Sequence, residues 1–239
     1  MSYRLDVLPD DAWADAVAAD LAARLAAKPD LRLCLPTGET PAPLYETLGR
    51  MADRGEVSFA NATIVLLDEY LGLPADDPAR GGPRLARELV ERVAPARYHA
   101  IDADATDPEA AARQHDAIAA DGLDLTLLGL GLNGHIGLNE PGSEAEAETA
   151  VVSLASRSQA VAQDYGAAAA PASGITLGIG RLLESGEIWL LVTGERKAGI
   201  LARALFGPEG PEVPATFLRR HPNYRVVADR SAAAEIPRD

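Results

Sequence analysis

Residues 62–69 read ATIVLLDE, a run of apolar and β-branched side chains that leads directly into two carboxylates. A short run that is apolar throughout, without alternation of apolar and polar residues, is typical of a strand covered on both faces. Strands covered in this way predict a mostly parallel sheet with helices on either side. We expect further strands at residues 31–35, 123–130, 151–154, 188–192 and 224–228.

Helical patterns separate the predicted strands. Residues 10–27 place Trp13, Val17, Leu21 and Leu25 on one helix face. Alternating strands and helices predict an α/β fold, with one doubly wound domain over residues 1–239 and a single Rossmann-like sheet with helices on both faces. The low-complexity stretch 166–174 is too short for a domain linker. Further helices are expected after Thr40, as N-cap with Pro41 at the first helical position, and at residues 84–93, 108–120 and 195–206.

Composition narrows the class of protein. The chain has 239 residues and a net charge of −14, which argues against nucleic acid or an anionic membrane as partner. The single cysteine, Cys34, cannot form an internal disulfide or a cysteine metal cluster. The first residues carry acids and lack the apolar core of a signal peptide, and no stretch approaches the roughly 18 apolar residues of a membrane span. We therefore expect a cytoplasmic protein.

Polar residues follow four of the predicted strands. In open α/β sheets the ligand binds beyond the carboxyl ends of the strands, so these residues are expected to meet at one edge. They supply hydroxyls, carboxylates, a histidine and a lysine, which suits a phosphorylated substrate that needs proton transfers. The segments are 37–40, 68–69, 129–140 and 193–197.

The first two segments each have an ordinary structural alternative. Residues 37–40, TGET, resemble a phosphate-binding turn whose free backbone N–H groups point at an anion, although many strand-to-helix turns look alike. Asp68 could act as a general base beside a substrate carbonyl. A helix cap or a solvated turn is the competing interpretation of Asp68 and Glu69.

The glycine-rich segment 129–143, GLGLNGHIGLNEPGS, is the strongest signal. Its start fits a dinucleotide-binding fingerprint, but it comes late in the chain and runs into His135 instead of a long apolar helix. Glu140 follows five residues later, and a carboxylate beside an imidazole fixes the tautomer of an acid/base group. His115, among polar neighbours, is expected at the surface. The histidine spacing predicts no metal site.

Four motifs together resemble one enzyme family. LPTGETP (35–41), LLDEYLGLP (66–74), GLGLNGHIGLNEPGS (129–143) and LLVTGERKA (190–198) occur in the order and at roughly the spacing of glucosamine-6-phosphate deaminases. That family shares a modified Rossmann-like fold with 6-phosphogluconolactonases. The resemblance implies conversion of glucosamine 6-phosphate to fructose 6-phosphate and ammonia, with a small-molecule sugar phosphate as partner and no cofactor.

The resemblance also implies roles for individual residues. Asp68 would move a proton between C2 and C1 of the opened sugar. His135 would open the ring, supported by Asn133 and Glu140. The phosphate site would be lined by Thr37, Gly38, Glu39 and Thr40, with the positive charge of Lys197.

The sequence departs from the family pattern at the phosphate site. Glu39 replaces a small residue, and Asp164 stands where typical deaminases carry an arginine. Replacing a bidentate arginine by a carboxylate is not conservative, and Arg157 or an arginine within 80–87 is a candidate to compensate. Between Ser143 and Val151 the chain has acids where allosteric deaminases place basic residues, so no activation by N-acetylglucosamine 6-phosphate is expected.

Two other functions are compatible with the sequence. A 6-phosphogluconolactonase-like hydrolase would use His135 to activate water and would not need Asp68 as a carbon base. A non-catalytic sugar-phosphate sensor would explain Glu39 and Asp164 but not the intact catalytic set. The chain lacks the longer C-terminal tail of hexameric relatives, so a monomer or a small homo-oligomer is expected. The exact sugar epimer stays open.

Overall fold

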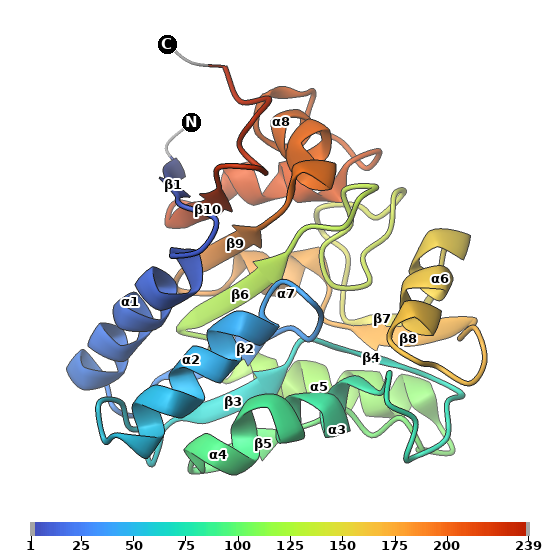
Figure 1. Cartoon of the computed structure of the whole chain (residues 1–239). Helices are drawn as coiled ribbons and strands as arrows, with labels where there is room; N and C mark the ends of the chain where they lie inside the picture. Colours follow the sequence, from blue (N-terminus) through green and yellow to red (C-terminus); the bar gives the residue numbers. More distant parts are fainter. Residues whose placement is uncertain (1–2, 238–239) are drawn as a thin grey trace.

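A computed structural model describes residues 3–237 and contains a seven-stranded sheet in which every neighbouring pair of strands is parallel. The strand order is β1-β10-β9-β6-β2-β3-β5. This agrees with the predicted parallel α/β sheet (Figure 1). The strands are β1 Tyr3–Leu8, β2 Arg32–Leu35, β3 Thr63–Leu66, β5 Arg97–His99, β6 Leu125–Gly129, β9 Ile188–Val192 and β10 Tyr224–Asp229.

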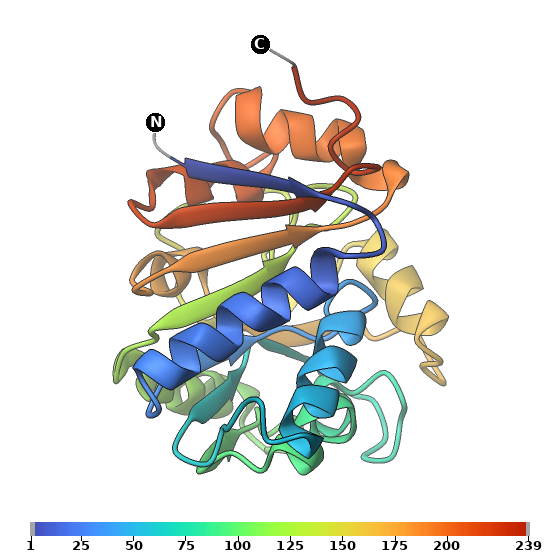
Figure 2. The ribbon, with the colours of Figure 1, turned by 60° about the vertical axis from the view of Figure 1, so that its left-hand side comes forward.

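Helices cover both faces of this sheet. Figure 2 shows α1 (Trp13–Ala27) and α2 (Ala42–Asp53) lying across one face. Along each strand the apolar side chains alternate between two cores: Leu33 and Leu35 pack in the core that holds α1 and α2, and Cys34 packs in the other. The second core takes α7 (Ile179–Leu183) and α8 (Ala198–Phe206). Because the sheet is buried on both faces, its inner strands are apolar at nearly every position.

The remaining helices complete the covering. A continuous helical segment over residues 81–93 consists of α3, a π-type turn and α4, and it packs with α2 in the first core. The other bounds are α3 Gly81–Leu85, η1 Ala86–Val90, α4 Glu91–Val93, α5 Pro108–Ala120, α6 Ser156–Asp164, η2 Glu195–Lys197 and η3 Pro214–Arg220. No helix within residues 3–237 is long and apolar enough to cross a membrane.

A small antiparallel sheet lies beside the large one. It has the order β4-β8-β7, with β4 at Asp68–Tyr70, β7 at Ala150–Ser153 and β8 at Ser173–Thr176. Asp68 therefore begins a strand of the small sheet, where the sequence had suggested a turn after β3. β8 starts inside the low-complexity stretch 166–174. Its short side chains carry no strand pattern of their own, and the strand forms by pairing with β4 and β7.

Some local predictions were wrong. Thr40 does not cap α2, which starts after Pro41 without any side-chain cap, because the Thr40 hydroxyl bonds across the pocket to Lys197. The elements β1, β4, β5, β8, α6 and α7 were not predicted. The strands expected at residues 31–35, 62–67, 123–130, 151–154, 188–192 and 224–228 and the helices expected at 10–27, 84–93, 108–120 and 195–206 are confirmed, with ends shifted by a few residues.

The order of the strands explains where a ligand binds. From β2 the chain adds β3 and β5 on one side, then returns to add β6, β9 and β10 on the other. The loops after β2 and β6 consequently run in opposite directions from the edge of the sheet. A crevice lies between them. The loop after β2 carries Thr37–Thr40, and the loop after β6 carries His135.

Candidate active site

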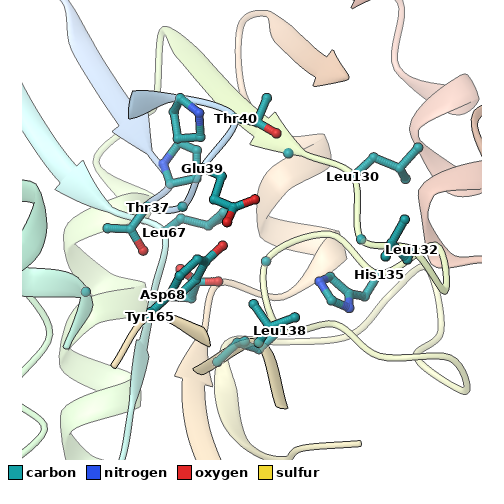
Figure 3. A pocket seen from close by; sticks show the side chains of 18 of the residues that line it. Thr37, Glu39, Thr40, Leu67, Asp68, Leu130, Leu132, His135, Leu138 and Tyr165 are labelled. Atoms are coloured by element: carbon teal, nitrogen blue, oxygen red, sulfur yellow. The ribbon is translucent and has the colours of Figure 1, made fainter. Parts of the chain in front are cut away.

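A cavity of about 320 Å³ lies in this crevice. Figure 3 shows side chains from the loop after β2, from the start of β4 and from the glycine-rich loop pointing into it. The volume lies in the range of small-ligand pockets. The predicted residues that line it are Thr37, Gly38, Glu39, Thr40, Asp68, His135 and Lys197. Asn133 and Glu140 are not part of the lining and instead contact or support His135.

Asp68 presents its carboxylate to the cavity from the first position of β4. Its strand position is fixed by pairing with Thr176 of β8. Gly137 crosses beside it with φ +57°, and a Cβ there would lie 2.7 Å from Thr176 Oγ1 and 3.5 Å from Asp68 Oδ2. Burial, with a smaller effect from the charge of Glu69, raises the pKa of Asp68 to about 7. A carboxylate with such a pKa is suited to act as a base near neutral pH.

Glu69 has a structural role. Its side chain is 2% exposed, and its Oε1 accepts N–H bonds from Tyr70 at 2.8 Å and Gly81 at 2.7 Å. Its Oε2 accepts from the N–H of Gly82 at 2.7 Å. Burial raises the pKa of Glu69, while these backbone donors oppose the rise. The carboxylate thus serves the free N–H groups at the start of α3, so the helix-cap interpretation holds for Glu69.

His135 lies against Glu140 and Asn133. Its Nδ1 is 3.5 Å from Glu140 Oε2, and Asn133 Nδ2 donates to the same oxygen at 2.9 Å. Asn133 Oδ1 accepts the backbone N–H of His135 at 3.2 Å. The glycine-rich loop is therefore a compact hydrogen-bonded unit that fixes the imidazole from one side.

The other ring nitrogen of His135, Nε2, has no hydrogen-bond partner within residues 3–237. Nε2 lies so close to Gly131 that a Cβ at that position would be 2.4 Å away. Only glycine leaves room for the imidazole to lie over the loop and face the cavity. Burial alone would raise the pKa of Glu140, but bonds from His135, Ser158 and Asn133 and the charge of His135 lower it to about 2. Glu140 is therefore an anion at neutral pH and favours a proton on Nδ1.

The opposite end of the cavity carries the lysine. Lys197 Nζ donates to Thr40 Oγ1 at 3.1 Å, and Thr193 Oγ1 donates to the same oxygen at 3.5 Å. Burial lowers the pKa of Lys197, although the carboxylates of Glu39 and Asp229 oppose this. In Figure 3 the side chain of Glu39 extends toward the cavity.

Helix α6 supplies lining residues that were expected only in part. Arg157 and Asp164 both line the cavity, together with Val161 and Tyr165. Their spacing along the chain is that of one helix face, a pattern that could have predicted this helix. Arg196, which belongs to the predicted segment 193–197, also lines the cavity. No role was predicted for it, because an arginine next to a lysine carries no distinctive signal.

The arginines of residues 80–87 do not line the cavity. Arg80 is 5% exposed and donates to both oxygens of Asp104 at 3.0 Å. Arg84 pairs with Glu88 at 2.7 Å and stacks on the ring of Tyr165 at 4.3 Å. Of the two suggested sources of compensation for Asp164, only Arg157 is in place.

The prediction that His115 lies at the surface was wrong. It is 2% exposed, and its Nε2 is 2.6 Å from the carbonyl oxygen of Leu66 at the end of β3. Burial lowers its pKa, so the ring is favoured in its neutral form. Within residues 3–237, no three His, Cys, Asp or Glu side chains are grouped so as to hold a metal ion.

Comparison with known proteins identifies relatives over nearly the whole chain. Residues 10–227 match the family model of glucosamine-6-phosphate isomerases/6-phosphogluconolactonase. The chain is 37% identical over 237 residues to a glucosamine-6-phosphate deaminase of Rhodopirellula baltica, covering 96% of this chain and 94% of that protein. A deaminase of Streptomyces coelicolor is 37% identical over 238 residues, with coverage of 96% and 91%.

Solved structures agree with these relatives. A monomeric glucosamine-6-phosphate deaminase superposes with a TM-score of 0.91 at 32% identity, covering 97% of this chain and 99% of that one. A 6-phosphogluconolactonase from Leishmania guyanensis, at 19% identity, has a TM-score of 0.81 over 100% of both chains and shares the fold. The chain belongs to the glucosamine-6-phosphate isomerase/6-phosphogluconolactonase family.

Proposed function

We propose that the protein converts glucosamine 6-phosphate and water to fructose 6-phosphate and ammonia. The observation that carries this proposal is the pair formed by Asp68, with a pKa of about 7, and His135 in one cavity whose far end holds Lys197. An aldose-to-ketose shift with loss of an amine needs a ring opener, a base at carbon and an anchor for the phosphate. These three residues supply the three functions, and the sequence relatives named above carry the same activity in their names.

The reaction begins at the sugar ring. His135 Nε2 takes the proton of the C1 hydroxyl, and the C1–O5 bond breaks as the proton passes to O5, which leaves an open-chain aldehyde. Asn133 and Glu140 support this step by holding Nδ1 and the loop backbone. The bond between Glu140 and the ring also stabilises the imidazolium that forms during the transfer.

Asp68 carries the second step. Its carboxylate removes the proton from C2, and the electrons of that C–H bond form a C1=C2 double bond. The aldehyde oxygen at C1 takes a proton from the substrate's ammonium group, which gives an enolamine. The protonated Asp68 then returns the proton to C1, which leaves a C2 iminium ion. Water adds to the iminium, and the C–N bond breaks to release ammonia and the 2-ketose. A carboxyl group whose pKa lies near 7 can act in both directions without a large free-energy penalty.

The phosphate group would lie between the loop after β2 and Lys197. Residues 37–40 and the hydroxyls around Thr40 line that end of the cavity. Glu39 and Asp164 oppose an anion there, and Arg157 and Arg196 are the lining arginines that can offset them. We further propose a monomer or small homo-oligomer, since the solved deaminase with a TM-score of 0.91 is described as monomeric. Because sugar phosphates are retained inside cells, we place the protein in the cytoplasm.

The test is an assay of purified protein with glucosamine 6-phosphate that measures ammonia and fructose 6-phosphate together. Equal amounts of both products, lost in His135→Ala and Asp68→Asn, are expected. Hydrolysis of 6-phosphogluconolactone that survives in Asp68→Asn, without any ammonia from the amino sugar, would favour the lactonase. Absence of turnover with both substrates, combined with binding of a sugar phosphate, would favour a sensor. Light scattering that gave a stable hexamer would contradict the proposed small assembly.

A further inference from the structure

Helix α6 presents two different faces. One face lines the cavity with Arg157, Val161 and Asp164. The other packs inward, where Ser158 is 1% exposed and Ala162 is fully buried. A serine is one of the less common residues in a protein interior, and its hydroxyl needs hydrogen-bond partners there.

Ser158 lies beside His135, which lines the cavity, and Glu140, which does not. Its Oγ is 3.4 Å from His135 Nδ1. The hydroxyl also lies near enough to the carboxylate of Glu140 to contribute to the lowering of its pKa. The backbone N–H of Ala155, at the start of α6, donates to Glu140 Oε1 at 3.3 Å. The first turn of α6 is thus joined to the His135–Glu140 pair at two points.

The surroundings of His135 Nδ1 favour one arrangement of donors and acceptors. Glu140 is an anion that can only accept, and its Oε2 lies 3.5 Å from Nδ1, so a proton on Nδ1 is favoured and the hydroxyl hydrogen of Ser158 is free to turn toward the carboxylate. The oxygen of Ser158 then offers its lone pairs to His135 Nδ1, which must carry a proton to use them. Nε2 is left as an acceptor facing the cavity, as the ring-opening step of the proposed function requires.

We propose that Ser158 is a positioning residue, which joins helix α6 to the His135–Glu140 pair and holds His135 in the tautomer with Nδ1 protonated. The inference rests on the proposed function for its kinetic consequence and on the hydrogen bonds alone for its structural one. It links the helix that carries Arg157 and Asp164 to the group that opens the sugar ring. The placement of α6 and the tautomer of His135 are then coupled: Ser158 holds the helix in place when His135 carries its proton on Nδ1.

The experiment compares three variants of the full chain. Ser158→Ala removes the hydroxyl, Ser158→Thr keeps it, and Ser156→Ala makes the same deletion at an exposed position of the same helix. We expect kcat to fall about tenfold in Ser158→Ala with KM changed less than about twofold, equivalent to ~1.4 kcal/mol in the barrier. Ser158→Thr should recover most of kcat, and Ser156→Ala should match the wild type.

A second measurement does not depend on turnover. Imidazole ¹⁵N shifts of uniformly labelled protein, with the His135 signals assigned by their loss in His135→Ala, report which nitrogen is protonated in the neutral ring. We expect a protonated Nδ1 in the wild type and in Ser158→Thr, and a mixture of tautomers in Ser158→Ala.

The outcomes separate this inference from the proposed function. Unchanged ¹⁵N shifts in Ser158→Ala, or an equal loss of kcat in Ser156→Ala, would overturn the role of Ser158. A wild-type protein without deaminase activity would overturn the proposed function, while the ¹⁵N shifts would still decide whether Ser158 sets the tautomer.

Discussion

Asp68 and Glu69 are consecutive carboxylates on β4 with different environments. Asp68 faces the cavity beside Gly137, and Glu69 accepts three backbone N–H bonds at 2.7–2.8 Å. Both environments arise because the chain leaves the large sheet at this point and enters the small one. The sequence resemblance implies that Asp68 is the base, and the three backbone bonds of Glu69 are those of a group that caps a helix.

The first prediction concerns the base. Asp68→Asn keeps the size of the side chain and removes its ability to take a proton from C2. We expect deaminase activity to fall by about 10³-fold, within the range for loss of a general base. The fall should appear in kcat with KM nearly unchanged, since the amide can keep polar contacts with substrate. Asp121→Asn, at an exposed helix end, is the matched control. Retention of more than about a tenth of kcat in Asp68→Asn would remove Asp68 from the mechanism.

The pH dependence follows from the raised pKa of Asp68. The base is active when ionised, so kcat/KM should rise with pH and level off above about pH 7. For stability the sign is opposite: the folded pKa lies above the unfolded value of ~3.9. The folded protein then holds more protons between the two values, so the contribution of Asp68 is full below the unfolded pKa and lost as pH rises through about 7.

The measurement is urea unfolding of wild type and Asp68→Asn at several pH values between 4 and 8. The stability of the variant relative to the wild type should increase with pH over this window. A difference that does not change with pH would mean that Asp68 keeps an ordinary pKa in the folded protein.

Glu69 gives the opposite pattern of effects. Glu69→Gln leaves an amide NH₂ facing backbone N–H donors and removes the negative charge at the start of α3. We expect a loss of about 2–3 kcal/mol in unfolding free energy, the magnitude for a buried, charge-assisted set of hydrogen bonds. Urea midpoints measure it, with Glu91→Gln at an exposed site as control. If Glu69→Gln were as stable as the wild type, the three bonds would be without net effect.

The contrast between His135 and His115 indicates how far sequence carries the argument. His135 could be identified because its partners lie in the same loop: Asn133 and Glu140 are within a few residues, and glycines make room for the ring. His115 sits among polar neighbours in the sequence, and its burial depends on the carbonyl of Leu66, 49 positions away. A local pattern contains no trace of that contact.

The same distinction explains the missed elements. β1 has an edge position and only partly buried side chains, so its sequence lacks the continuous apolar character of the inner strands. β8 consists largely of small residues that are buried by pairing with β4 and β7. The inner strands were predicted well because burial on both faces requires an apolar side chain at nearly every position.

The effector prediction concerns residues 144–148. Glu144, Glu146 and Glu148 are exposed, and Glu146 pairs with Arg220 at 3.2 Å. A phosphorylated effector approaching this segment would meet carboxylates, so N-acetylglucosamine 6-phosphate should leave the rate curve hyperbolic and KM unchanged. Initial rates over a range of substrate, with and without millimolar effector, decide the matter. A sigmoidal curve that becomes hyperbolic on addition of the effector would show an allosteric site that this segment does not explain.

The last prediction addresses the two carboxylates at the phosphate end. Glu39 and Asp164 both line the cavity, and each places a negative charge near the end where we propose that the doubly charged phosphate binds. Removing one charge near a partly solvated site is worth on the order of 1 kcal/mol, so Glu39→Gln and Asp164→Asn should each lower KM for glucosamine 6-phosphate by about fivefold. The effect should shrink at high salt, because screening weakens the repulsion that the substitutions remove. Arg157→Gln should act in the other direction and raise KM, and Glu46→Gln on the exposed face of α2 is the neutral control. KM values that stay constant in Glu39→Gln and Asp164→Asn at low salt would mean that both carboxylates turn away from the bound phosphate. A rise in KM in Glu39→Gln would instead assign Glu39 a contact with the substrate's hydroxyl or ammonium groups, which would place the sugar in the cavity in the reverse orientation.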